Sequence, residues 1–108
     1  GVKQIRLPKR NSYSSHIFHQ YTIVLDDSLN RDDFKDYLNQ KGVPSMVYYP
    51  IPLHKQKAFS AFSTSQKSMS FPNAEELCHQ VLSLPMHTEL TPEQIDFITT
   101  EIQTFFTL

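Results

Sequence analysis

The sequence has few of the residues on which several common functional sites depend. It contains two glycines in 108 residues, which excludes a glycine-rich loop of the kind that cradles nucleotide phosphates. Its single cysteine, Cys78, cannot form an internal disulfide or a zinc site built on paired cysteines, and such cysteine usage is typical of the cytoplasm. No apolar run reaches the roughly 18 residues of a membrane-spanning helix, so we expect no membrane contact.

The sequence also lacks an excess of either positive or negative charge. Ten basic and eleven acidic residues give a formal net charge of −1, so nucleic acid is not an expected partner. What the chain does have is 39% hydrophobic and 12% aromatic residues, enough for one compact core and hence one domain over residues 1–108. The chain begins with glycine rather than methionine, and we expect it to be a piece of a longer protein.

The apolar pattern predicts an α+β fold, a small three-stranded sheet covered by helices. Residues 1–15 are polar, contain a proline and are expected to form an irregular lead-in. Strands are expected at residues 17–25, 43–49 and 82–85. The serine-rich residues 60–70 are expected to form a loop.

Capping signals predict three helices. Asn30 caps the first, which ends before Gly42; Pro72 opens the second; Thr91, with Pro92 and a capping box to Gln94, opens the third. Helical spacing predicts one buried stripe on each of the last two helices. The expected buried residues are Ala74, Leu77, Cys78 and Val81 on one helix, and Ile95, Ile98, Ile102 and Phe105 on the other.

Histidine and cysteine do not form a recognisable catalytic or metal motif. His16 and His19 lie three apart in an expected strand and therefore on opposite faces, which disfavours joint coordination of a metal. His79 and His87 are expected at the surface. Cys78 lies on an apolar stripe, where it acts as a small apolar group rather than as a nucleophile. We predict no metal site and no catalytic residue in this chain.

The segment VYYPIPLHKQ, residues 47–56, is the strongest candidate for a ligand site. Its two prolines fix the backbone, so tyrosine hydroxyls and a histidine ring would be presented with little conformational freedom. In the alternative interpretation, which composition alone favours, Tyr48 and Tyr49 cap the core while His54 and Lys55 face water.

Several sequence blocks occur in an order that resembles a known family. They are HQY (19–21), RDDFKDYLNQKG (31–42), YPIPLHKQ (49–56), FPNAEEL (71–77), VLSLPMH (81–87) and LTPEQI (90–95). The chain resembles the C-terminal small domain of the DegT/DnrJ/EryC1/StrS family, aminotransferases that use pyridoxal phosphate and act on nucleotide-linked ketosugars.

The resemblance implies a fold type I enzyme whose small domain has a mainly antiparallel sheet. It implies that the large domain, absent from this chain, holds pyridoxal 5'-phosphate and the Schiff-base lysine, so no cofactor-binding residue is expected here. Lys67, in a serine-rich context, is expected to be solvated rather than to be that lysine. The implied partners are glutamate, a nucleotide-linked ketosugar and a second subunit in a cytoplasmic homodimer, and polysaccharide biosynthesis is one implied pathway.

The resemblance also implies that Tyr48 faces the sugar nucleotide. We predict Tyr48, Tyr49 and His54 as the substrate-binding residues, with Tyr48 in contact with the substrate and the other two positioning its loop at the domain boundary. Family members often have histidine where this chain has Tyr48, so its sugar preference is expected to differ. Two alternatives remain open from the sequence: a non-catalytic module that binds a sugar nucleotide or a partner protein, and a domain of a sugar dehydratase dependent on pyridoxal or pyridoxamine phosphate.

Overall fold

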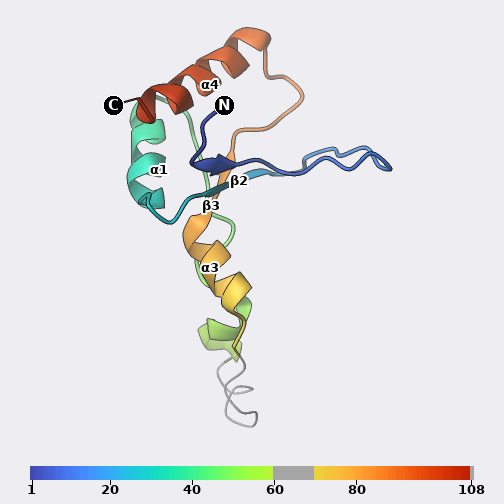
Figure 1. The fold of residues 1–108 in the computed structure, drawn as a ribbon, viewed down its shortest axis with the longest axis vertical. Helices are drawn as coiled ribbons and strands as arrows, with labels where there is room; N and C mark the ends of the chain where they lie inside the picture. Colours follow the sequence, from blue (N-terminus) through green and yellow to red (C-terminus); the bar gives the residue numbers. More distant parts are fainter. Residues whose placement is uncertain (60–69, 108) are drawn as a thin grey trace.

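The computed structural model describes residues 1–59 and 70–107, arranged as a small sheet with helices packed on it (Figure 1). The strands are β1 (Ile5–Arg6), β2 (Tyr21–Leu25) and β3 (Val81–Leu84). The α-helices are α1 (Arg31–Gln40), α3 (Pro72–Gln80) and α4 (Pro92–Phe105). Two short 3-10 turns, η1 (Leu53–Lys55) and η2 (Lys57–Phe59), lie between α1 and α3. The strand order is β1-β2-β3 with both pairs antiparallel, which confirms the predicted α+β class.

The core lies between the sheet and helices α1 and α4. Ile23 pairs with Leu82 across β2 and β3, and Leu25 lies two residues further along the same face of β2. The buried cluster consists of Ile23, Leu25, Phe34, Leu38, Val43, Leu82 and Ile102. Two partly buried aromatic side chains pack against this cluster, with the Phe105 ring 4.8 Å and the Phe106 ring 5.4 Å from the ring of Phe34.

The predicted strands are partly wrong. The third strand is β1, from the expected lead-in, and it pairs with the end of β2 through Ile5 and Leu25. Residues 43–49 form only an isolated bridge between Met46 and Ser83, with N–H to carbonyl distances of 3.0 and 2.7 Å. Pro44 and Pro50 lack the backbone donors that a longer ladder needs. β2 begins at Tyr21 rather than at residue 17, because Phe18 has a positive φ of 48° that breaks an extended strand.

The helix boundaries agree with the capping signals. The Asn30 side chain accepts hydrogen bonds from the backbone N–H groups of Asp32 and Asp33, at 3.0 and 3.4 Å. Gly42 has a φ of 77° after α1, as expected for a residue that ends a helix. Thr91 and Gln94 form the predicted reciprocal capping box at the start of α4. The expected loop at residues 60–70 falls almost entirely outside the described residues, as does Lys67.

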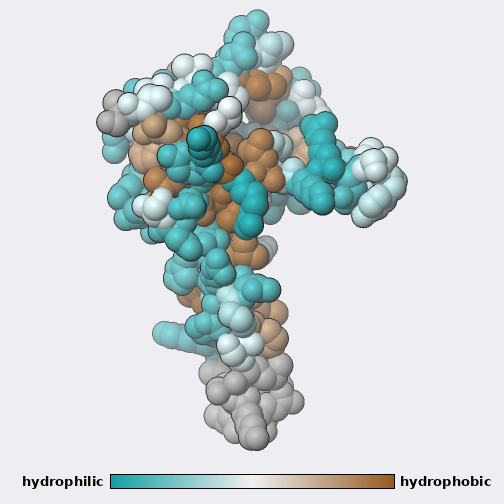
Figure 2. Space-filling model, in the orientation of Figure 1, coloured by the Kyte–Doolittle hydropathy of each residue, from teal (hydrophilic) through white to brown (hydrophobic). Residues whose placement is uncertain are grey.

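The predicted buried stripes are wrong in part. In α4 Ile102 is buried, whereas Ile95 is 48% exposed. In α3 no residue is buried, Leu77 is 39% exposed and Cys78 is half-buried. The reason is the direction of α3, which extends away from the sheet so that its apolar side has little to pack against (Figure 1). Figure 2 shows apolar patches among polar ones along this extension.

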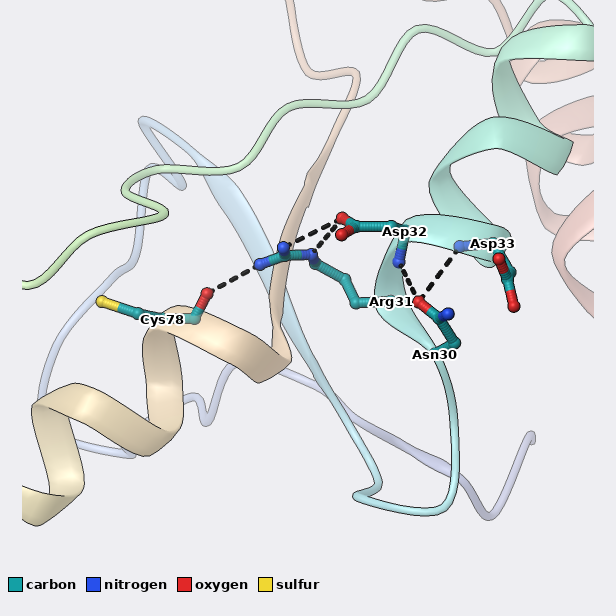
Figure 3. A network of polar contacts seen from close by, with 5 residues as sticks. All are labelled: Asn30, Arg31, Asp32, Asp33 and Cys78. Carbon is teal, nitrogen blue, oxygen red and sulfur yellow. Dashed lines mark hydrogen bonds and ion pairs between the residues drawn. The ribbon is translucent and has the colours of Figure 1, made fainter.

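Arg31 anchors the base of α3 to α1 (Figure 3). Its Nη1 donates a 2.7 Å hydrogen bond to the carbonyl of Cys78, and its Nε donates at 2.9 Å to Asp32. The Cys78 carbonyl lies in the last turn of α3, where carbonyls have no partner within the helix. The guanidinium side chain is only 11% exposed, so this contact is shielded from water. The arginine thereby fixes where α3 leaves the sheet.

Ser45 gives a stability prediction. Its Oγ is buried and has no hydrogen-bond partner among the described residues, which is a cost to the folded state. Replacing Ser45 with alanine is therefore expected to raise the free energy of unfolding by about 1 kcal/mol in urea denaturation. The matched control is Ser83→Ala, which removes the 2.8 Å hydrogen bond between the Ser83 and Thr22 hydroxyls. This control is expected to have a lower free energy of unfolding than the wild type. Equal losses in the two variants would contradict this account of Ser45.

Candidate functional site

A surface hollow of about 330 Å³ lies where three separate parts of the chain meet. The pairing of Tyr21 with Leu84 brings the residues just before β2 beside those just after β3. The bridge between Met46 and Ser83 places residues 44–48 against β3. The hollow is lined by His19, Gln20, Pro44, Met46, Tyr48, Ser83, Leu84, Pro85 and Met86, and we call it the Tyr48 hollow.

Alternation of the extended backbone directs Tyr48 into this hollow. Pro44, Met46 and Tyr48 line it at a spacing of two, whereas the intervening Ser45 is buried on the opposite side. Tyr48 remains 39% exposed, so its phenol is accessible to a ligand. The polar side chains of His19, Gln20 and Tyr48 make no hydrogen bond to other side chains or backbone groups in the described part of the chain. They therefore offer donors and acceptors to a ligand, and no carboxylate lines the hollow.

The structure separates the three predicted substrate-binding residues. Tyr48 lies in the hollow, and Tyr49 packs edge-on against it with ring centroids 5.9 Å apart, but Tyr49 is 68% exposed and does not line the hollow. His54 does not line it either; it lies in η1 and contacts α3. Of the three, only Tyr48 lines the hollow; Tyr49 contacts the Tyr48 ring and His54 contacts α3.

His54 and Lys55 both bind one carboxylate on α3. His54 Nε2 lies 2.9 Å from Glu75 Oε1, and Lys55 Nζ lies 2.5 Å from Glu75 Oε2. The His54 ring also packs on Phe71, with centroids 4.9 Å apart. The hydrogen bond from Lys55, followed by that from His54, lowers the pKa of Glu75 to about 2. We call these contacts of Glu75 with His54 and Lys55 the Glu75 clamp.

The low pKa of Glu75 predicts an acid-dependent loss of stability. Because the folded pKa of about 2 lies below the ordinary value of 4.5, the clamp contributes fully above pH 4.5 and is lost as the pH falls toward 2. Urea denaturation of the wild type and of Glu75→Gln between pH 7 and pH 2 tests this. The wild type is expected to be more stable than Glu75→Gln at pH 7, and this difference in the free energy of unfolding is expected to shrink as the pH falls from 4.5 toward 2. A difference that does not change with pH would contradict the assigned pKa.

Sequence reasoning did not select His19, Gln20 and Met86 as site residues. The available signal was their position, since the HQY block lies at the start of one strand and the PMH residues follow another. Antiparallel pairing of those strands brings the two blocks to the same end of the sheet. Glu75 was also missed, because its contact with His54 spans 21 residues of sequence.

The Tyr48 hollow does not by itself fit pyridoxal phosphate. Its lining includes neither a lysine for a Schiff base nor an arginine or lysine for the phosphate. In the described parts of the chain, no group of three or more histidine, cysteine, aspartate or glutamate residues is arranged to hold a metal ion. No helix in residues 1–59 and 70–107 is long and apolar enough to cross a membrane.

Comparison with known proteins identifies the family. The model of the DegT/DnrJ/EryC1/StrS aminotransferase family matches residues 1–103. The chain belongs to this family. The DegT/DnrJ/EryC1/StrS assignment confirms the resemblance drawn from the sequence blocks, and it covers the Tyr48 hollow and the Glu75 clamp.

Relatives in the family support the same assignment. The chain is 43% identical to the UDP-N-acetyl-3-dehydro-alpha-D-glucosamine 3-aminotransferase of Acidithiobacillus ferrooxidans and 39% identical to the pleiotropic regulatory protein of Geobacillus stearothermophilus. Each match covers 92% of this chain and 25% of the relative. The structure of NtdA from Bacillus subtilis with the bound cofactor PMP has a TM-score of 0.81 at 28% identity, over 98% of this chain and 24% of that one. The chain therefore spans about a quarter of the length of these relatives.

Proposed function

We propose that residues 1–108 form the C-terminal small domain of an aminotransferase dependent on pyridoxal phosphate, which moves an amino group from glutamate to a keto carbon of a nucleotide-linked sugar. The observation that carries this proposal is the Tyr48 hollow. Two family blocks that are far apart in the sequence, HQY and VLSLPMH, and the segment 44–48 supply its walls and leave polar groups facing it. The nucleotide sugar in the name of the Acidithiobacillus ferrooxidans relative supports the substrate class.

In this proposal Tyr48 contacts the substrate directly. Its phenol both donates and accepts hydrogen bonds and stays neutral near pH 7, which suits a sugar hydroxyl or a phosphate oxygen. Tyr49, packed against Tyr48, and His54, held by Glu75, position the segment rather than touch the ligand. None of the three is proposed to transfer a proton or to form a bond with the substrate.

The remaining parts of the enzyme lie outside this chain. A large domain is proposed to hold the cofactor and the lysine that binds it, and the cofactor supplies the electron sink for amino transfer. Apolar side chains exposed on the surface, including Leu53, Phe71 and Leu77, are consistent with a docking face for that domain. We further propose that the parent protein is a cytoplasmic homodimer, and polysaccharide biosynthesis is one pathway that the family resemblance implies for it.

The test is transfer of labelled nitrogen by the full-length protein. Purified enzyme with pyridoxal phosphate and ¹⁵N-glutamate is incubated with UDP-linked and dTDP-linked 3-keto and 4-keto sugars, and the products are analysed by mass spectrometry. The proposal predicts an amino sugar that carries ¹⁵N from at least one of these substrates. A deoxy sugar without nitrogen would instead indicate the dehydratase, and binding without turnover would indicate the non-catalytic module; either result would overturn the proposal.

A further inference from the structure

We propose that Glu75 is a positioning residue for the sugar nucleotide, because its clamp on His54 and Lys55 fixes the segment that presents Tyr48. The proposal rests on the proposed function of the Tyr48 hollow and adds a residue that does not touch that hollow. Glu75 lies in the first turn of α3, on a different element from Tyr48, so its effect must pass through the chain between His54 and Tyr48.

The segment between Tyr48 and His54 has little packing of its own. Between Tyr48 and His54, the side chains of Tyr49, Ile51 and Leu53 are all exposed. Its beginning is held against β3 by the bridge of Met46 to Ser83, at N–H to carbonyl distances of 3.0 and 2.7 Å. The other end is held by contacts of His54 and Lys55 with α3, and the clamp supplies the charged ones.

Two prolines stiffen the segment that joins η1 to Tyr48. Pro50 and Pro52 fix two of its backbone torsions. The N–H of Lys55 donates to the Pro52 carbonyl at 2.9 Å, and the N–H of Gln56 donates to the Leu53 carbonyl at 3.1 Å, which closes η1 as a single turn. With two φ torsions fixed and η1 closed as one turn, a displacement of η1 is expected to reach Tyr48.

The clamp engages both oxygens of one carboxylate. Glu75 receives His54 on Oε1 and Lys55 on Oε2, and the Phe71 ring packs against the imidazole. Two contacts from adjacent residues of η1 fix its orientation as well as its distance from α3. Arg31 in turn ties the C-terminal end of α3 to α1, so the helix that carries Glu75 is attached to the core of the domain.

The test compares Glu75→Gln with Glu76→Gln in the full-length enzyme. Glu76 is the adjacent carboxylate on α3, is exposed, and contacts Gln80 rather than η1. The expected result for Glu75→Gln is a KM for the sugar nucleotide raised about threefold with unchanged kcat and unchanged KM for glutamate, since the clamp is partly exposed to water and acts on ground-state and transition-state binding equally. Glu76→Gln is expected to leave all three values unchanged.

A double variant separates positioning from general loss of structure. If Glu75 acts through His54, the effects of His54→Gln and Glu75→Gln on KM are expected not to add, and the double variant should match the larger single effect. Three results would overturn the positioning role: additive effects on the KM for the sugar nucleotide, a fall in kcat in Glu75→Gln, or an unchanged KM for the sugar nucleotide in Glu75→Gln. Absence of amino transfer by the wild type would instead overturn the proposed function, so the two failures are distinguishable.

Discussion

Replacing Phe34 with alanine is expected to lower the free energy of unfolding by about 3–5 kcal/mol. Phe34 is fully buried on α1, and its ring contacts those of Phe105 and Phe106 at the end of α4. Truncation removes the apolar burial and the aromatic pairs and leaves a cavity between the helices and the sheet. Since a domain of this size is stable by only about 5–15 kcal/mol, the loss is a large part of the total.

Equilibrium unfolding in urea, followed by far-UV circular dichroism, measures this change. The matched control is Phe97→Ala on α4, because the Phe97 side chain is 47% exposed and its removal is expected to cost less than about 1 kcal/mol. A loss for Phe34→Ala no larger than that for Phe97→Ala would contradict the placement of Phe34 at the centre of the core.

Replacing Tyr48 with phenylalanine is expected to raise the KM for the sugar nucleotide about tenfold, with kcat changed by less than about twofold. The phenol lines the hollow and makes no hydrogen bond to other described residues, so its partner is expected to be the ligand. A hydrogen bond to a charged phosphate oxygen has the strength that such a change requires. Steady-state kinetics at saturating glutamate measure both constants.

Tyr49→Phe provides the comparison for this measurement. It removes the same hydroxyl from the neighbouring residue, whose ring packs on Tyr48 but does not line the hollow. Since the ring contact is retained, its KM is expected to change by less than about twofold. Equal effects of the two substitutions, or no effect of Tyr48→Phe, would contradict the assignment of Tyr48 as the direct contact.

Features that depend on neighbouring residues were predicted from the sequence. The caps at Asn30 and Thr91 and the positive φ of Gly42 involve groups within a few residues of one another, so their residue types determine them. The order of helices also agreed with the pattern. The strand predicted at residues 82–85 is observed at Val81–Leu84, so Val81, which was predicted on a helix, lies buried in β3. The blocks that carry the family resemblance could be recognised from the sequence for the same reason, since each is a short local motif.

Features that depend on contacts between residues far apart in the sequence were not predicted. Ile5–Arg6 became a strand because Leu25 and Val24 offered an edge, and nothing within the polar first residues signals that partner. The helical spacing in α3 was correct, but spacing cannot show that α3 leaves the sheet and exposes Leu77. The same limit hid the Glu75 clamp, whose members lie in separate elements.

The central claim is that this chain is one domain of an aminotransferase that uses pyridoxal phosphate. The most direct test is the absorbance spectrum of the full-length protein purified with added pyridoxal phosphate, before and after glutamate. The account predicts a protein-bound cofactor band that borohydride abolishes and that glutamate converts to the spectrum of pyridoxamine phosphate. A protein that shows no such band, and still binds a sugar nucleotide, would contradict it.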